Sequence, residues 1–213
     1  RDIAVGGGLV LVPSDDGKKL VAARQAVVVM TSLEHKTGTD RAAEAVKLFT
    51  DFIPEIVVVV WGDEPLYPAS VIDACVEKLL SDPELSAVVA ADRVVDETML
   101  AADSVVKIVT DKNDRALYIS RALIPHHFKE DRPDYYHVIG AMAMRTDFLS
   151  QYVEMEQTPH EIRESVEQLR ILENGHKLGV VRGDFKNLGV NTPRQLEEVI
   201  RIFGERIKNG ELE

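Results

Sequence analysis

A run of four valines that ends in an acidic turn constrains the fold of this chain most. Residues 57–65 read Val-Val-Val-Val-Trp-Gly-Asp-Glu-Pro. Four successive β-branched residues suit a strand covered on both faces, and the glycine and proline force the chain to turn as it leaves the sheet. Asp63 is therefore expected at the carboxyl edge of a sheet, where open α/β folds bind ligands and a carboxylate can hold a hard cation. The alternative is a solvated acid in a polar turn.

Strand and helix patterns alternate along the chain, which predicts an α/β fold. The expected strands are 9–12, 26–30, 57–60, 87–91, 105–109, 116–119, 138–144 and 177–181, and the expected helices are 16–24, 39–49, 70–80 and 194–208. A further long helix is expected after Thr158, which is placed to cap it, and Pro159, which suits its first turn. The turn-rich Asp-Lys-Asn-Asp at 111–114 predicts a hairpin between strands 105–109 and 116–119.

The composition is that of a single globular domain spanning residues 1–213, with 45% hydrophobic and 29% charged residues. The formal net charge of -11 opposes broad binding to nucleic acid or to an anionic membrane, because no cluster of Lys and Arg offsets it. With one cysteine, Cys75, the chain can form no internal disulfide and no cysteine-built metal site, which fits a reducing cytoplasm. No apolar run approaches the roughly 20 residues of a membrane-spanning helix.

Several short motifs follow one another in a characteristic order. They are Met-Thr-Ser at 30–32 with Thr-Gly-Thr-Asp-Arg at 37–41, Gly-Asp-Glu-Pro at 62–65, Val-Lys-Ile-Val at 106–109, Ala-Leu-Tyr-Ile-Ser-Arg-Ala-Leu-Ile-Pro at 116–125, Glu-Gln-Leu-Arg at 167–170 and Val-Asn-Thr-Pro at 190–193. Each motif alone is weak, but their order is specific. The chain resembles the CMP-Kdo synthetase family, the 3-deoxy-manno-octulosonate (Kdo) cytidylyltransferases.

The resemblance implies a Rossmann-like nucleotidyltransferase sheet, mostly parallel, with a small hairpin-containing subregion at about 103–145 that serves the acceptor and dimerisation. It implies a homodimeric, Mg²⁺-dependent, cytoplasmic enzyme that transfers CMP from CTP to a small acidic acceptor and releases pyrophosphate. In such a reaction the protein mainly aligns two anions and neutralises charge on the leaving group. Magnesium prefers oxygen ligands.

The resemblance also assigns residues to the nucleotide and the metal. Thr37, Gly38, Thr39, Arg41 and Gly62 would bind the nucleotide, and Asp63 and Asn191 would bind the metal. The alternative for the first four is a loop with a helix N-cap, because a threonine suits that position equally well.

Catalytic and acceptor-binding roles are implied for further residues. Asp63, Arg121 and Lys107 would be catalytic, and the acceptor would meet Trp61, Arg121, Met142, Glu164 and Glu167. Arg121 could hold an acceptor carboxylate with two hydrogen bonds, and Lys107 could add a second positive charge. Glu164 and Glu167, three residues apart, would share one helical face. The alternatives are cations lying along a sheet edge and a solvated helix face.

The chain departs from the family pattern at the acceptor and metal positions. Trp61 replaces a glutamine, Met142 replaces a tyrosine, and Asn191 replaces an aspartate. These changes suggest a compact acceptor, such as the phosphonate phosphonoformate, as an alternative to Kdo. A catalytically weakened nucleotide-binding homologue and a purely structural module are further alternatives. Residues 1–12 contain no counterpart of the family's N-terminal strand and phosphate loop, so we expect about 40–50 residues before Arg1 in the natural protein.

Overall fold

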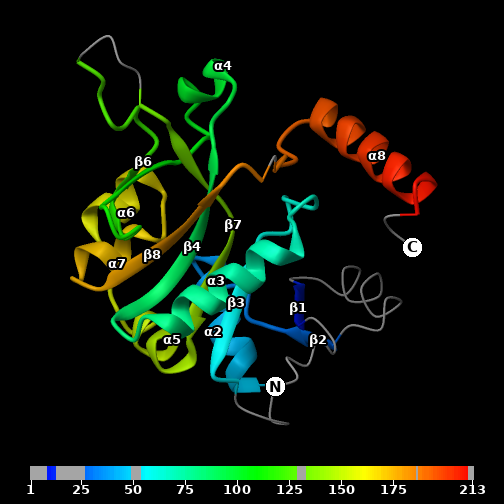
Figure 1. The fold of residues 1–213 in the computed structure, drawn as a ribbon. Helices are drawn as coiled ribbons and strands as arrows, with labels where there is room; N and C mark the ends of the chain where they lie inside the picture. The colour runs from blue at the N-terminus through cyan, green and yellow to red at the C-terminus, as the bar shows by residue number, and fades with distance from the viewer. Residues whose placement is uncertain (1–8, 13–26, 49–53, 129–132, 186, 211–213) are drawn as a thin grey trace.

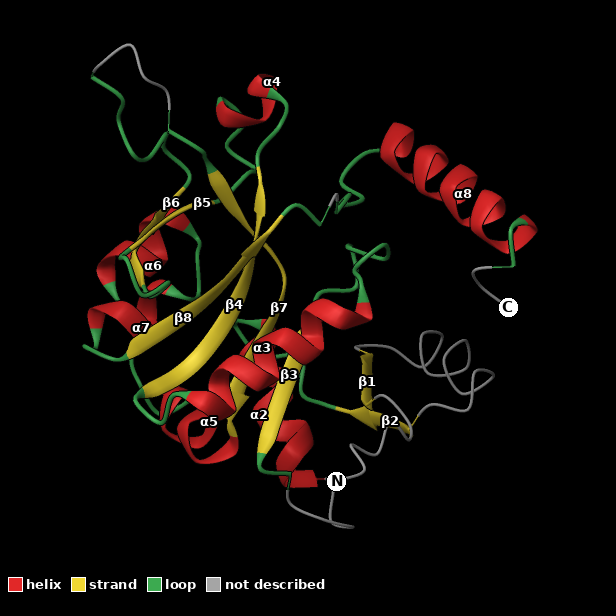
Figure 2. Ribbon diagram, in the orientation of Figure 1, coloured by secondary structure: helices red, strands yellow, loops and turns green. Residues whose placement is uncertain are grey.

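The computed structural model describes residues 9–12, 27–48, 54–128, 133–185 and 187–210. They form an α/β fold in which helices flank a mixed sheet (Figures 1 and 2). The strands are β1 (Leu9–Val12), β2 (Val27–Met30), β3 (Ile56–Val60), β4 (Leu85–Arg93), β5 (Lys107–Thr110), β6 (Ala116–Ser120), β7 (Tyr136–Arg145) and β8 (Lys177–Gly183). The helices are α2 (Gly38–Leu48), α3 (Ala69–Ser81), α4 (Glu97–Leu100), α5 (Thr146–Tyr152), α6 (Pro159–Glu164), α7 (Leu169–Glu173) and α8 (Pro193–Lys208). The expected strands and the hairpin are confirmed, whereas the helix expected at 16–24 lies outside the described residues.

The main sheet is mixed rather than mostly parallel. Its strand order is β6-β5-β7-β4-β8, with β3 also paired to β7, and its only parallel pair in the described part of the chain is β4 with β8. The reason is the long strand β7, which runs antiparallel to β3, β4 and β5. Strands β1 and β2 pair in parallel as a separate two-stranded sheet.

One edge of β7 is shared by two strands, and this creates a gap in the sheet. Residues 136–137 of β7 pair with β5, and residues 141–145 pair with β3. Between these two stretches, the backbone of β7 forms hydrogen bonds with the residue that follows β3 and with the residue that precedes β5. The Trp61 amide donates to the Gly140 carbonyl at 2.9 Å, and the Val138 amide donates to the Val106 carbonyl at 2.8 Å. The end of β3 and the start of β5 therefore face each other across this gap.

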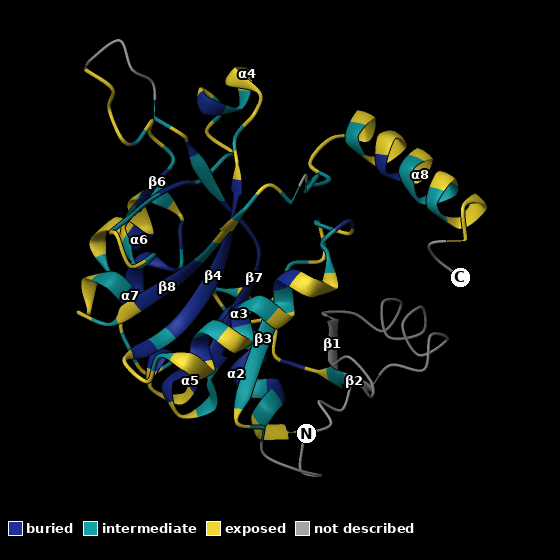
Figure 3. Ribbon diagram, viewed as in Figure 1, coloured by how far each residue is buried: buried dark blue, intermediate teal, exposed yellow. Residues whose placement is uncertain are grey.

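The core lies on both faces of β4, which is buried along most of its length (Figure 3). Ala87, Val89 and Ala91 face a cluster that includes residues of α2, α5 and α7. Val88 and Ala90 face a second cluster that includes α3. This alternation follows from the period of two in a strand, and it explains why β4 is an almost continuous apolar run.

The long helix expected after Thr158 is instead two short helices. The start is as predicted, because Thr158 and Glu161 form a capping box and Pro159 occupies the first turn. Helix α6 ends at Glu164, where Ser165 adopts a left-handed conformation with φ of 51°, and α7 begins only at Leu169. The apolar spacing continues across the break, so the helical pattern alone did not predict it.

Two smaller expectations concern Cys75 and membrane segments. Cys75 is fully buried in the cluster beside α3, and burial raises the pKa of its thiol to about 12, as suits an inert core residue. Among the helices of the described residues, none is both long and apolar enough to cross a membrane.

Candidate active site

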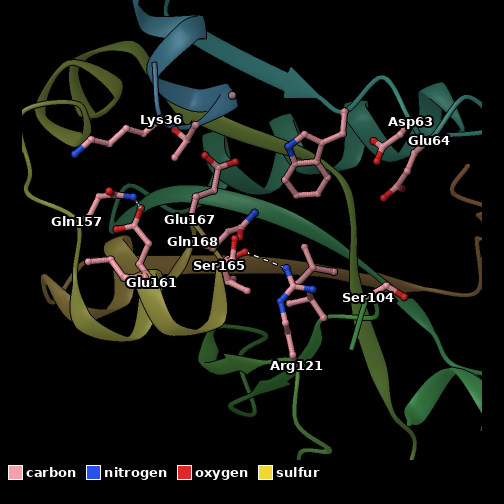
Figure 4. Close-up of a pocket in the computed structure, with 17 residues that line it drawn as sticks. Lys36, Asp63, Glu64, Ser104, Arg121, Gln157, Glu161, Ser165, Glu167 and Gln168 are labelled. Carbon is pink, nitrogen blue, oxygen red and sulfur yellow. Dashed lines mark hydrogen bonds between the residues drawn. The ribbon is translucent and has the colours of Figure 1, made fainter. Parts of the chain in front are cut away.

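A pocket of about 520 Å³ opens at the gap between β3 and β5. It is lined by Lys36, Thr37 and Gly38 before and at the start of α2, by Trp61, Asp63 and Glu64 after β3, by Ser104, Val106, Arg121 and Val138 around the hairpin and β7, and by Gln157, Glu161, Ile162, Ser165, Val166, Glu167 and Gln168 around α6. Lys36 and Gln157 lie at one end and Asp63 and Glu64 at the other, with Glu167 between them (Figure 4). The pocket therefore joins segments that are far apart in the sequence.

The first wall is the start of α2, which Thr37 and Asp40 hold in place. The Asp40 amide donates to Thr37 Oγ1 at 3.1 Å, and the Thr37 amide donates to Asp40 Oδ2 at 3.2 Å. This reciprocal capping leaves Thr37 and Gly38 on the pocket surface, as expected for nucleotide contacts, while Thr39 is buried beneath them. The N-cap and the ligand-binding interpretation are thus compatible.

Arg41 secures the loop before α2 rather than lining the pocket. Its Nη1 donates to Thr31 Oγ1 at 2.6 Å and to the Ser32 carbonyl at 2.9 Å. From the next turn of α2, Glu44 accepts the Ser32 amide at 2.8 Å and pairs with His35. These two bonds use the N–H groups of Nη1 to hold the loop, and Arg41 is not among the residues that line the pocket.

The second wall is the turn after β3, where the sequence predicted it. Asp63 is exposed at the pocket, and Glu64 is partly buried behind it. Burial raises the pKa of Glu64, although its carboxylate accepts the Gly140 amide at 2.8 Å and a hydrogen bond from the Asn187 side chain. A Cβ at Gly140 would lie 2.7 Å from Glu64 Oε2 and 3.0 Å from Glu64 Cβ, so a larger residue there would displace the Glu64 side chain.

Asn191, the second predicted metal ligand, is on the segment that adjoins Asp63. The Val190 amide donates to the Asp63 carbonyl at 2.7 Å, and Asn191 is exposed. Among the described residues, no group of three or more His, Cys, Asp or Glu side chains is placed to hold a metal ion.

Arg121 lines the pocket, but much of its hydrogen-bonding capacity is used internally. Its Nε donates to the Glu164 carbonyl, Nη1 to the Asp103 carbonyl at 2.6 Å and Nη2 to the Ser165 carbonyl at 3.1 Å (Figure 4). A guanidinium has five N–H groups, so about two, one on each terminal nitrogen, are left for a ligand. Arg121 therefore braces the loop after α6 and can still meet an anion.

Lys107 and Met142 lie away from the pocket. Lys107 is fully buried, burial lowers its pKa, and its Nζ donates to the carbonyls of Ala102, Val105 and Arg121. The Lys107 ammonium group is therefore bonded to backbone carbonyls and does not line the pocket. Met142 is also fully buried, within the core cluster beside α5 and α7. Its predicted contact with an acceptor does not fit this position, because the side chain faces the core.

Glu164 and Glu167 do not share a helical face, because α6 ends between them. Glu164 accepts Ser120 Oγ at 2.7 Å and the Arg121 amide at 2.8 Å, so it lies behind the pocket lining. Glu167 is in the pocket lining, beside Thr37 and Thr39, and burial raises the pKa of its carboxyl more than those neighbours lower it. Gly62 is exposed but is outside the lining.

Glu167 is expected to lower the stability of the fold at neutral pH. Because its pKa is higher in the folded chain than in the unfolded chain, ionisation above pH 4.5, the ordinary glutamate value, disfavours folding. We expect Glu167→Gln to unfold at a higher temperature than the natural chain at pH 8, with the difference disappearing as the pH falls toward 4.5. Thermal unfolding at both pH values measures this, with the exposed Glu77→Gln as control. A constant difference at all pH values would contradict the prediction.

Several pocket residues were not predicted. Lys36, Ser104, Gln157, Ser165 and Gln168 bring polar groups into the lining. Gln168 is a member of the quoted motif at 167–170, and Lys36 adjoins Thr37 of another motif, so both had a usable signal in the sequence. Gln157 and Ser104 carried no such signal, because only the packing of α6 and the chain before β5 brings them to the pocket.

The fold is similar to that of two solved structures. The chain is similar to the structure of CMP:2-keto-3-deoxy-manno-octonic acid synthetase complexed with CTP, with a TM-score of 0.85 and 26% identity, over 96% of this chain and 83% of that one. The structure of 4-diphosphocytidyl-2C-methyl-D-erythritol synthase from Anaerococcus prevotii shares the fold alone, with a TM-score of 0.57 and 16% identity over 92% and 78%. The fold and the pocket define a CTP-dependent nucleotidyltransferase.

Sequence comparisons narrow this class to one family. The family model described as cytidylyltransferase matches residues 10–178. The chain is 38% identical to the 3-deoxy-manno-octulosonate cytidylyltransferase of Solibacter usitatus, over 94% of this chain and 79% of the relative. It is 35% identical to that of Fusobacterium nucleatum, over 83% and 71%. The chain therefore belongs to the cytidylyltransferases, within the 3-deoxy-manno-octulosonate cytidylyltransferase family, and the resemblance seen in its motifs is confirmed.

Proposed function

We propose that this chain transfers CMP from CTP to Kdo and releases pyrophosphate. The main support for this proposal is that Thr37, Asp63, Arg121 and Glu167 line one pocket, which opens at the end of β3. The relatives that share most of its length are named for this reaction. An acceptor hydroxyl oxygen attacks the α-phosphorus of CTP, its proton passes to solvent water, and the bond from the α-phosphorus to the pyrophosphate oxygen breaks.

The chain's own residues would align the two anions. Thr37 and Gly38 would contact the nucleotide, and the two free N–H groups of Arg121 would meet the acceptor carboxylate. The carboxylate of Glu167 and the amide of Gln168 are suited to hydrogen bonds with acceptor hydroxyl groups. Such positioning supplies most of the catalysis expected of a group-transfer enzyme without a covalent intermediate.

We propose Mg²⁺ as the metal that the reaction requires. Asp63 and Asn191 offer one carboxylate and one amide oxygen on adjoining segments, and both are exposed. This partial donor set fits magnesium, which usually keeps waters and substrate phosphates among its ligands. When bound, the ion would neutralise charge on the departing pyrophosphate.

The pocket favours a polyhydroxylated acceptor over a compact phosphonate. The phosphonate hypothesis depended on Trp61 and Met142 meeting a compact acceptor, but Met142 is in the core and only Trp61 is in the lining. Gln157, Ser165 and Gln168 add polar groups to the same lining. Hydroxyl groups of a sugar acid can use these partners, whereas phosphonoformate would leave many of them without one.

We further propose that the protein is a homodimer of a reducing, cytoplasmic compartment. Leu117 of the β5–β6 hairpin is a large apolar side chain that is 63% exposed. Burial against a second copy would remove this side chain from water. Light scattering of the full-length protein should give twice the chain mass, and Leu117→Asp should shift the mass toward the monomer.

Pyrophosphate release by the full-length natural protein, with CTP and magnesium, tests the proposed activity. Turnover with Kdo, and none with phosphonoformate, is expected. Turnover with phosphonoformate alone would overturn the acceptor assignment. A CTP-dependent rise in unfolding temperature without turnover would favour a weakened nucleotide-binding homologue, and the absence of any shift would favour a structural module.

A further inference from the structure

One buried arginine connects two sides of the pocket. The Arg170 side chain, 3% exposed, donates from Nε and Nη2 to the two carboxylate oxygens of Glu161, at 2.9 and 2.5 Å. Its Nη1 lies 3.4 Å from Asp40 Oδ1 and 3.4 Å from the Tyr152 carbonyl oxygen. The guanidinium carbon lies 4.4 Å from the centre of the Tyr152 ring. Arg170 of α7 thus contacts carboxylates from both α6 and α2.

Each of these carboxylates also caps the helix that carries it. Asp40 Oδ2 accepts the Thr37 amide at 3.2 Å, which holds Thr37 at the first wall of the pocket. Glu161 Oε2 accepts the Thr158 amide at 3.1 Å, which holds the start of α6 at the facing wall. A single guanidinium therefore joins the N-terminal caps of two helices whose first turns form separate walls of one pocket.

We infer that Arg170 is a positioning residue that sets the spacing between these two walls and so aligns the nucleotide with the acceptor. The inference rests on the proposed function, in which one wall holds CTP and the other holds the sugar acid. A buried ion pair adds little net stability compared with apolar packing, but its hydrogen bonds have a defined geometry. Such geometry matters here because a misplacement of about 1 Å can lower turnover by about 100-fold.

Two conservative variants of the full-length protein separate positioning from a general loss of stability. Asp40→Asn keeps an oxygen for the Thr37 amide but removes the charge that faces Arg170. Glu173→Gln is the matched control, because Glu173 Oε2 accepts two backbone amides of the first turn of α6, at 3.2 and 3.3 Å. It therefore loosens α6 without touching α2.

We expect Asp40→Asn to lower kcat by about 10–100-fold with a change of less than about threefold in the KM for CTP. Glu173→Gln should retain kcat within about threefold. In amide hydrogen exchange without substrates, Asp40→Asn should speed exchange at both 37–40 and 158–162, although Asp40 does not contact the second segment. The control should speed exchange at 158–162 only.

Equal losses of kcat in the two variants would overturn the inference. Unchanged exchange at 158–162 in Asp40→Asn would do the same, because the two caps would then move independently. Absence of turnover by the unsubstituted protein with CTP and Kdo would count against the proposed function instead. In that case the exchange measurement, which needs no substrate, still decides whether Arg170 couples the two walls.

Discussion

Replacing Asp63 with asparagine is expected to lower the rate of pyrophosphate release by about 10²–10³-fold while the fold stays intact. The magnitude is that of removing one preorganised electrostatic group from an active site. The fold should survive because the side chain is exposed and its structural contact, acceptance of the Val190 amide at 2.7 Å, uses the backbone carbonyl. Steady-state assays with CTP, Kdo and varied magnesium measure the loss, and a higher magnesium requirement should accompany it.

The matched control is Asp73→Asn, which removes an exposed carboxylate from α3, away from the pocket lining. Its rate should equal that of the natural protein within about twofold, as is usual for a surface substitution. If Asp63→Asn keeps more than a tenth of the natural rate at saturating magnesium, Asp63 does not hold the metal in the reacting complex.

Replacing Glu161 with alanine is expected to lower the free energy of unfolding by about 3–5 kcal/mol. Both side chains of the Glu161–Arg170 pair are 3% exposed, so the substitution leaves a buried cation with the longer contacts to Asp40 and the Tyr152 carbonyl and the contact with the Tyr152 ring. It also removes the capping bond to the Thr158 amide. Urea unfolding measures the change, provided that the dependence on denaturant concentration is unchanged.

The surface pair Arg201–Glu205 provides the control, because its side chains are 61% and 57% exposed. Glu205→Ala should change the free energy of unfolding by less than about 0.5 kcal/mol. A double variant, Glu161→Leu with Arg170→Leu, should recover much of the stability, since the uncompensated charge is gone. If it is as unstable as Glu161→Ala, lost capping and packing, rather than the buried charge, explain the effect.

Local patterns predicted the elements that carry the site. The valine run placed Asp63 at the end of β3, and the motif at 37–41 placed Thr37 and Gly38 at the start of α2. These predictions held because hydrophobic period, capping residues and turn residues act over a few neighbouring positions. The direction of a strand in the sheet, in contrast, is not determined by neighbouring positions in the sequence. The antiparallel course of β7 depends on partners 43 to 89 residues away in β4 and β3, so the expected mostly parallel sheet was wrong.

The roles of the lysine and arginine residues in the motifs were harder to predict. The sequence does not show whether such a residue contacts a ligand or holds the surrounding backbone. Lys107 and Arg41 bond to nearby backbone and loop atoms, whereas Arg121 divides its N–H groups between such bonds and the pocket. Arg170, in the Glu-Gln-Leu-Arg motif, is the residue that joins two pocket walls. A motif identifies such residues, but it does not distinguish a residue that binds the ligand from one that holds the structure around the pocket.

By itself, the sequence determined the α/β class, the family, and the segments that meet at the pocket, because apolar period, turn chemistry and motif order are properties of the chain. Only the tertiary structure decided which members of those motifs face the pocket. Met142 lies in the core, and Glu164 accepts the Arg121 amide behind the pocket lining. Helix α6 ends before Ser165, and Glu167 beyond this break lies in the lining. The physical reason is that buried polar groups must find partners and apolar ones must pack, and distant segments supply both.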